Sequence, residues 1–510
     1  MKLSRRNLLQ MFAATAASSV AARYASAAWP DPLAIWEPAS QAGSYTPRKV
    51  LEIFLRGGAS QWGAFWYDPI LGGSRTGSPA GTGDDDISTT DWGNLITGGG
   101  APTVHNWESR QIGRAAGPMF RLKNNGAGTP NRKLADYMRV LYVAHDLLPH
   151  EAAIPYATTG TTLGRPHQAG LGAAIWRRHD PVAPAGIRSL VLQVGGASGD
   201  DLAANYLAST GQHGVMYRPP IVKLGDTAFY DALPRTGLTS LPQEDFKKFY
   251  RNRYEARLKY SGAPSAVRSA GWTAYQASLD TMQQYHDDLY TLLTAYAADL
   301  FPNPAITVPD YHTNNLSRNA VKTAIKMLKA PGSLLKHVAV VDGGVEADYD
   351  THKPPPAGTI AAGRVEIVQN GNIWNICDTL ANNLNAILDN NIVVLIHSEF
   401  GRREETPDDG TEHHMPGYTN VVIGDVITNP GFTGEASGAD GSVAAMIATA
   451  AGHPFSPIAG QPIALSPTDV HAAVAACAGI DPWQADMFEG DLDKSRTLGG
   501  DSAGILLGVS

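Results

Sequence analysis

The chain has 510 residues, of which 43% are hydrophobic and 17% are charged, and its formal net charge is −8. An acidic balance of this kind does not favour phosphate backbones or anionic lipid, so we expect no nucleic-acid partner. With two cysteines in the whole chain and no CxxCH, the sequence offers neither a disulfide framework nor a haem or cysteine-ligand site, and we expect no haem and no nucleotide cofactor.

The first residues have the pattern of a twin-arginine export signal. Arg5 and Arg6 precede an alanine-rich apolar stretch over residues 8–22, and small residues up to Ala27 form a cleavage pattern. The alternative is a short amphipathic first helix. We expect residues 1–27 to be removed after passage through the twin-arginine machinery, which makes the protein periplasmic or secreted. The mature chain then has 36 basic against 48 acidic residues and no apolar run long enough for a transmembrane segment.

Six short apolar runs predict the strands of one α/β sheet. The run at residues 392–396 has five consecutive apolar residues, which is typical of a central strand covered on both faces of a parallel sheet. The other runs lie at residues 49–56, 139–144, 189–194, 336–341 and 420–423. Because the runs are spread from end to end, we predict a single domain over residues 28–510 with a doubly wound, mostly parallel sheet.

Three helices are predicted from their starts and their periodicity. One helix is expected to open near Pro166, because proline fits the first helical position. An amphipathic helix over residues 373–388 leads straight into the central strand. The third covers residues 466–478, where Ser466 is followed by a proline and then by Asp469, a favourable helix start.

Two long segments interrupt the strand pattern and are predicted as insertions. Residues near 70–130 are crowded with Gly, Ser, Thr and Asp and lack periodicity, so we expect an irregular loop insertion. Residues near 225–315 contain apolar and aromatic residues at helical spacing and predict two or three helices. Cys377 and Cys477 can pair in an oxidising compartment, but two separately buried thiols agree better with the behaviour of lone cysteines.

Polar residues follow four of the predicted strands. The carboxyl ends of parallel strands share one edge of a sheet, and ligands bind in the crevice beyond that edge. We therefore expect these residues to meet although they are far apart in sequence. The four pairs are Ser60 with Gln61, His150 with Glu151, Asp350 with His352, and Glu399 with His413.

Glu399, His413 and His414 are the candidates for a cation site near the central strand. A strand-end carboxylate and a histidine pair on the next loop can meet at one metal ion. The alternative for Glu399 is a solvated carboxylate or an ion pair with Arg402. The alternative for the histidines is an exposed loop, since the pair lacks the i, i+4 spacing of a helical zinc motif.

Several motifs together resemble one exported family, the domain of unknown function 1501. They are FLRGGASQW at residues 54–62, DTH at 350–352, HSEFGR at 397–402, GTEHH at 410–414, and LSPTDVHAAVAACAGIDP at 465–482. The resemblance extends over most of the mature chain. It implies the alkaline phosphatase and sulfatase superfamily, an alkaline-phosphatase-like doubly wound fold, and a metal site at the strand ends.

The resemblance places the metal-type motifs on Asp350, His352, Glu399 and His413. In the superfamily these clusters hold one or two divalent metals, and a hydroxyl or modified cysteine attacks phosphorus or sulfur. This chain departs from that pattern, since Arg56 stands where phosphatases have a metal-binding Asp. No hydroxyl opens the helix expected near Pro166. The remaining candidates for a nucleophile are Ser60, Thr159, Thr161 and Thr162.

Two functions are consistent with these residues. The first is a metal-dependent hydrolase of small or polymeric phosphate or sulfate esters, with Zn or Mn favoured over Ca because imidazoles are among the ligands. A metal-bound water would attack, Arg402 or Arg56 would neutralise the developing charge, and Ser60 and His150 complete the catalytic candidates. The second is a non-catalytic periplasmic or surface scaffold that retains the fold.

Overall fold

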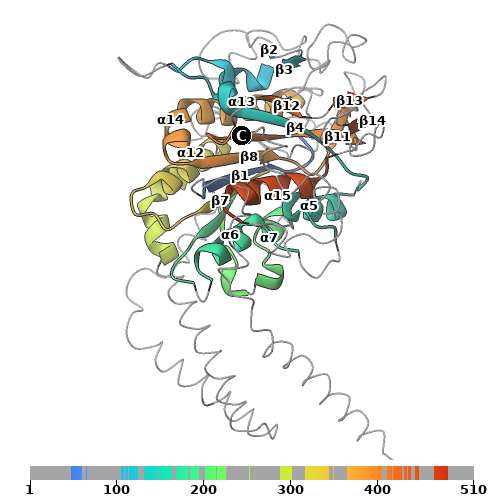
Figure 1. The fold of residues 1–510 in the computed structure, drawn as a ribbon. Coiled ribbons are helices and arrows are strands. Elements are labelled where there is room, and N and C mark those ends of the chain that lie inside the picture. The colour runs from blue at the N-terminus through green and yellow to red at the C-terminus, as the bar shows by residue number, and fades with distance from the viewer. Residues whose placement is uncertain are drawn as a thin grey trace, which may run out of the picture.

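The computed structural model describes the following residues: 47–59, 65, 105–107, 110–112, 114–123, 131–147, 149–163, 168–181, 184–194, 202–213, 215–224, 252, 288–300, 316–343, 349, 365–404, 411–415, 417–427, 430–433, 435–437, 443–446 and 465–480. Within these ranges a central sheet has helices on both of its faces (Figure 1). The proposed signal peptide at residues 1–27 lies outside the described residues and stays a prediction.

Eight strands form the sheet, in the order β12-β4-β11-β8-β1-β7-β5-β6. All of them run in the same direction except β11, which is antiparallel to both β4 and β8. The predicted mostly parallel α/β sheet is therefore confirmed. The strands are β1 (Lys49–Leu55), β4 (Met138–Ala144), β5 (Ser189–Val194), β6 (Ile221–Lys223), β7 (His337–Asp342), β8 (Ile392–His397), β11 (Gly417–Ile423) and β12 (Gly431–Thr433).

The position of β8 matches its sequence pattern. It lies fourth in the order, between β11 and β1, and all six of its residues are buried. The six predicted strands are confirmed to within a few residues at their ends. The three-residue strands β6 and β12 were not predicted, because they are too short to show a period.

One face of the sheet is covered by α12 (Leu316–Lys329), α13 (Val365–Asn382) and α14 (Leu384–Asp389). In α12 the buried positions recur at helical spacing, so a single apolar stripe faces the sheet. The stripe packs with Leu51 and Ile53 of β1, and Cys377 of α13 belongs to the same cluster.

The opposite face is covered by α5 (His150–Thr159), α6 (Leu171–His179), α7 (Leu202–Leu207) and α15 (Pro467–Cys477). Val50 and Phe54 of β1 point into this layer, as the period of two along a strand requires. Cys477 is buried here, so the two cysteines lie in different layers. Neither thiol is in a disulfide, which confirms the prediction of separately buried cysteines and not the disulfide alternative.

The start of α15 agrees with its sequence. Ser466 and Asp469 form a capping box, in which the Ser466 backbone N–H donates to the Asp469 carboxylate at 2.8 Å. This arrangement satisfies donors that a helix start otherwise leaves unpaired. The predicted helix over residues 466–478 is confirmed.

The helix expected near Pro166 begins later, at Leu171. Residues 168–170 are held in an extended conformation, because Ala169 bridges Thr210 and the Gly170 N–H donates to the Ser209 carbonyl at 3.0 Å. Gly170 is required at this point, since a Cβ there would lie 2.1 Å from the Leu207 carbonyl oxygen. Pro166 itself is outside the described residues.

The prediction of a single amphipathic helix over residues 373–388 is also wrong in detail. Two helices occupy the segment, and they are separated at Asn383, whose N–H donates to the carbonyls of Thr379 and Leu380. Residues 371–380 of α13 are buried all round, so this stretch of the helix has no solvent-exposed face. It packs between the sheet and the 3-10 helix η1 (Arg114–Phe120).

Shorter elements lie around the sheet. The described part of the predicted insertion near 70–130 contains η1 and a hairpin of two strands, and the described part of the insertion near 225–315 ends in a short helix. The remaining elements are β2 (His105–Trp107), β3 (Arg110–Ile112), η2 (Leu134–Tyr137), η3 (Gly211–His213), η4 (Val215–Tyr217), α11 (Ala297–Leu300), β9 (Gly401–Glu404), β10 (Thr411–Met415), β13 (Glu435–Ser437) and β14 (Val443–Met446).

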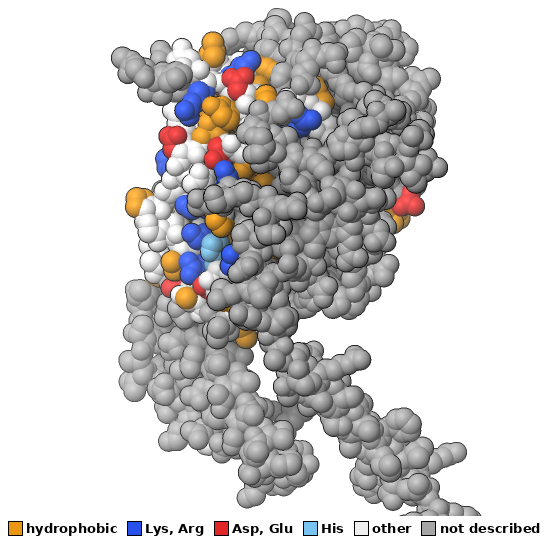
Figure 2. Space-filling view, viewed as in Figure 1, with side chains coloured by type: hydrophobic (Ala, Val, Ile, Leu, Met, Phe, Trp, Pro, Cys, Tyr) orange, Lys and Arg blue, Asp and Glu red, His pale blue; other side chains and the backbone are white. Residues whose placement is uncertain are grey.

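Over the ranges given above, no helix combines the length and the apolar character needed to cross a bilayer. On the face shown in Figure 2, the described surface carries lysines and arginines interspersed with acidic side chains.

Buried His213 predicts a loss of stability in mild acid. Burial, and then the charge of Arg177, lowers the pKa of His213 from 6.5 to about 4. Above pH 6.5 this histidine is neutral in both the folded and the unfolded protein, and its effect on the free energy of unfolding is zero. Between pH 6.5 and about 4 only the unfolded chain binds the proton. The free energy of unfolding therefore falls in this range, by up to about 1.4 kcal/mol per pH unit.

The change that tests this effect is His213→Gln. We expect the variant to lose stability less steeply than the wild type between pH 6.5 and about 4, as measured by urea denaturation at several pH values. Other titrating groups cancel in the comparison of the two proteins. Parallel pH dependences for the two would contradict the prediction.

Candidate functional site

Three strand ends meet at Glu399, which follows β8 and is fully buried. Its Oε1 accepts a hydrogen bond from the Gly57 N–H at 2.7 Å, just beyond β1. The same oxygen lies 3.0 Å from Nδ1 of His150, the first residue of α5, which follows β4. The structure therefore brings together two of the predicted site residues, Glu399 and His150, at the carboxyl edge of the sheet.

The turn after β1 is shaped by its glycines. Gly57 has φ 111° and Gly58 has φ 79°, both in the left-handed region that favours glycine. The turn directs the Gly57 N–H at Glu399, and the next amide, Ala59 N–H, donates to Ser398 Oγ at 3.0 Å. The loops after β1 and β8 are thus fastened to each other by backbone donors.

Glu399 is held in its ionised form. Burial alone would raise its pKa, but the hydrogen bond and charge of His150, together with the Gly57 N–H, outweigh burial and lower the pKa below its usual range. The Ser398 hydroxyl lies 3.3 Å from Oε2 of Glu399, but it can donate only one hydrogen bond. The shorter contact, 2.6 Å to the Leu55 carbonyl, is the one that it makes. Oε2 therefore keeps lone pairs that a cation can use.

His145 fixes the backbone of Glu399. Its Nε2–H donates to the Glu399 carbonyl at 2.5 Å, and its Nδ1 accepts from the Leu147 N–H at 3.1 Å. These two contacts specify a neutral imidazole, in agreement with the burial that lowers its pKa. His145 acts as a positioning residue for the loop after β8.

A second buried carboxylate, Asp342, ends β7 at the same edge of the sheet. Its Oδ1 accepts from Ser317 Oγ at 2.7 Å, and its Oδ2 accepts from Tyr349 Oη at 2.7 Å and Asn372 Nδ2 at 2.8 Å. The Tyr349 N–H in turn donates to the Arg56 carbonyl at 2.9 Å. Tyr349 directly precedes the predicted ligand Asp350, so this network anchors the chain where the DTH motif begins.

The other predicted site residues are placed as follows. Arg56 is partly buried in the turn after β1, next to Gly57. Arg402 lies in β9 and His413 in β10, and the two are paired in the register of this antiparallel hairpin; His414 follows in β10. The side chains of these three hairpin residues are not described, and Ser60, Asp350 and His352 lie outside the described residues.

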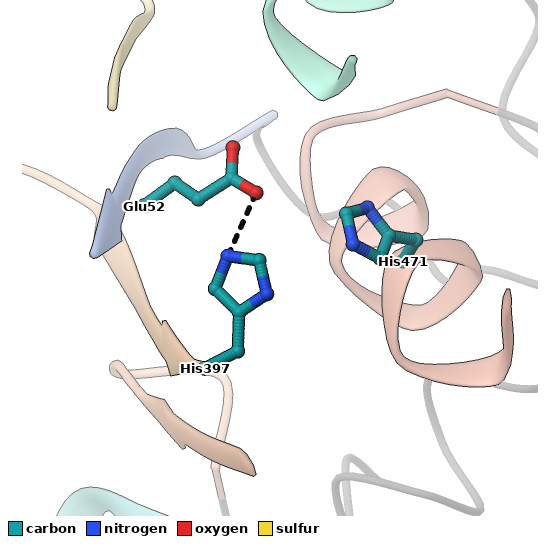
Figure 3. A group of neighbouring side chains, drawn as sticks. All are labelled: Glu52, His397 and His471. Atoms are coloured by element: carbon teal, nitrogen blue, oxygen red, sulfur yellow. Dashed lines mark ion pairs between the residues drawn. The ribbon is translucent and has the colours of Figure 1, made fainter. Parts of the chain in front are cut away.

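A second group of metal-type side chains was not predicted (Figure 3). Glu52 in the middle of β1, His397 at the end of β8 and His471 on α15 bring their ligand atoms within 4.8 Å of one another. The available signal was a charged residue inside an otherwise apolar buried strand, which is costly unless a partner compensates it. No sequence spacing identifies those partners, since each comes from a different element.

Two histidines lie against the carboxylate of Glu52. Its Oε2 lies 3.0 Å from His337 Nε2, and its Oε1 lies 3.1 Å from His397 Nε2. Burial alone would raise the pKa of Glu52, but these two contacts outweigh it and lower the pKa below its usual range. Burial also lowers the pKa of His471 to about 4, which leaves that imidazole neutral.

Comparison with known proteins gives a limited result. No protein-family model and no curated protein matches the chain. Among solved structures, Ps i-CgsB in complex with k-i-k-neocarrahexaose is similar at 10% identity, over 85% of this chain and 72% of that one, with a TM-score of 0.32. The lipoteichoic acid synthase LtaP from Listeria monocytogenes is similar at 7% identity, over 88% and 78%, also with a TM-score of 0.32. Ps i-CgsB on its own is similar at 10% identity, over 89% of this chain and 77% of that one, with a TM-score of 0.32.

Similarities this weak carry no argument about the activity of this chain. The resemblance to the family of the domain of unknown function 1501 is not shown by them and stays a prediction. Any inference about the chemistry of the site therefore depends on the geometry of the site itself. That geometry is an ionised, oriented carboxylate beside a histidine, at the carboxyl edge of a mostly parallel sheet.

Proposed function

We propose that the chain is an exported, metal-dependent hydrolase of phosphate or sulfate esters with an alkaline-phosphatase-like fold. The observation that carries the proposal is Glu399. One of its carboxylate oxygens is fixed by the Gly57 N–H and His150, and the other keeps lone pairs at the edge where ligands of α/β sheets bind. Its sequence relatives would be the exported family of the domain of unknown function 1501.

In this proposal Glu399 Oε2 is one ligand of a divalent cation. The loops that follow the neighbouring strands supply the others, Asp350, His352 and His413, with His414 as an alternative, and this mixed set suits Zn or Mn. The metal supplies polarisation of the ester oxygen and a water of lowered pKa. His150 keeps the Glu399 carboxylate oriented, while Arg56 and Arg402 neutralise charge on the ester, and Ser60 is the candidate nucleophile after the glycine turn.

The test is an activity assay of the full chain before and after metal removal. The protein is treated with a chelator, dialysed, and supplied with Zn or Mn, with aryl phosphates and aryl sulfates as probes. We expect hydrolysis of one ester class that disappears with the metal and returns with it. A folded, metal-supplied protein that is inert towards both esters would contradict the hydrolase and favour the scaffold.

A further inference from the structure

The buried group Glu52, His397 and His471 shares no residue with the proposed ester site and is closed to solvent. The three residues are 0%, 2% and 1% exposed and come from β1, β8 and α15. In Figure 3 the ring of His471 lies on the side of its helix that faces Glu52 and His397. Its polar side chains face one another and not the solvent, so we consider a small ion held inside the protein.

Each of the three residues has one buried polar atom without a hydrogen-bond partner among the described residues. These atoms are Glu52 Oε1, His397 Nε2 and His471 Nδ1. Glu52 Oε1 and His397 Nε2 are 3.1 Å apart but are not aligned as a hydrogen bond. Buried polar atoms left unsatisfied cost about 1 to 3 kcal/mol each, so three at one place call for a shared partner.

The surroundings hold these atoms in position. His471 Nε2–H donates to the Ala157 carbonyl at 2.7 Å, which leaves Nδ1 as a bare lone pair. Glu52 Oε2 is held by His337, whose Nδ1 lies 2.8 Å from Ser189 Oγ. Metal-binding histidines commonly have the other ring nitrogen fixed in this way by a carbonyl or a carboxylate.

We propose that Glu52, His397 and His471 form a closed binding site for one first-row transition-metal ion, with Zn²⁺ the best fit, that ties α15 to the sheet. Two ligand atoms about 2.0 to 2.1 Å from a tetrahedral zinc lie roughly 3.3 Å apart, close to the 3.1 Å between Glu52 Oε1 and His397 Nε2. Two imidazoles and one carboxylate suit zinc and disfavour Ca²⁺ and Mg²⁺, which take oxygen ligands.

A single proton does not satisfy this group. A proton shared between His397 Nε2 and Glu52 Oε1 would satisfy two of the atoms and leave His471 Nδ1 unpaired. A metal ion satisfies all three lone pairs at once, and a buried water can complete its tetrahedral coordination. One buried water could also reach three polar atoms, and the metal content of the protein distinguishes the two occupants.

The experiment measures metal content in a protein that lacks the strand-end ligand. Full-length Glu399→Gln is purified, stripped with a chelator, supplied with Zn²⁺ and dialysed, and its zinc is counted by mass spectrometry. We expect about one equivalent to remain and the melting temperature to rise by roughly 5 to 10 °C over the stripped protein. Because the background lacks Glu399, this result is independent of the proposed hydrolase.

Variants locate the ion. Adding His471→Gln or Glu52→Gln is expected to remove the equivalent and the rise in melting temperature, while the control His213→Gln, which also replaces a buried histidine, keeps both. Should these variants not fold, Co²⁺ added to the stripped Glu399→Gln protein is expected to give the visible absorption of a tetrahedral site. Zinc that stays bound in His471→Gln, or a protein that binds neither ion, overturns the proposal and leaves a water or a proton as the occupant.

Discussion

Glu399→Gln is expected to lower kcat/KM for ester hydrolysis by roughly two to three orders of magnitude. The amide has the size of the carboxylate, and its oxygen can still accept from the Gly57 N–H, so the loop keeps its anchor. The variant loses the negative charge, and an NH₂ group takes the place of Oε2, which removes the proposed cation ligand. The decrease should appear mainly in kcat and should be accompanied by the loss of the metal on which hydrolysis depends.

The control for Glu399→Gln is Asp136→Asn, the same change of a carboxylate to an amide at an exposed position in η2. We expect this variant to hydrolyse the ester like the wild type. Steady-state kinetics and metal content on the same preparations check both results. A Glu399→Gln protein with wild-type kinetics and unchanged metal would show that Glu399 is a structural carboxylate only.

Asp342→Ala is expected to lower the free energy of unfolding by about 3 to 5 kcal/mol. Asp342 is fully buried and accepts from Ser317, Tyr349 and Asn372, so its removal leaves several donors without an acceptor in a dry environment. The same network anchors Tyr349 beside the end of β1, directly before Asp350. We therefore expect lower hydrolytic activity as well as lower stability.

Urea denaturation of Asp342→Ala and Asp389→Ala checks this prediction. Asp389 is a matched aspartate whose side chain is 67% exposed and whose ion pair with Arg132 has a long separation of 4.0 Å. Its removal is expected to change stability by less than about 0.5 kcal/mol, as is usual for exposed pairs. Equal effects of the two substitutions would mean that the Asp342 network contributes nothing to the fold.

The sheet could be predicted because its buried strands appear in the sequence as short runs of apolar residues. The apolar run of β8 has that pattern because the strand is covered on both faces. The start of α6 could not be predicted, since the bridge between Ala169 and Thr210 holds the preceding residues extended, and this pairing joins segments remote in the chain. The break between α13 and α14 lies at Asn383, whose N–H donates to both the Thr379 and the Leu380 carbonyl, a local change in hydrogen bonding that a hydrophobic period does not reveal.

For the two groups of site residues, too, the sequence predicts positions along the chain but not the partners that packing brings together. Glu399 was found because the position after a central strand predicts where a ligand binds, whatever the neighbours are. Glu52 was missed because its significance depends on His337, His397 and His471, which three other elements bring to it. The charge within the apolar sequence KVLEIFL was visible, but only the packing of α15 and β8 shows what it faces.

Docking of α15 over Glu52 also affects when an ion can bind. A group that is 0 to 2% exposed exchanges an ion only when the elements covering it open transiently, so binding is fastest before α15 docks. If the chain is exported already folded, as we propose, the ions available at synthesis would reach the site first. Conditions outside the cell would then act on the site only through such openings.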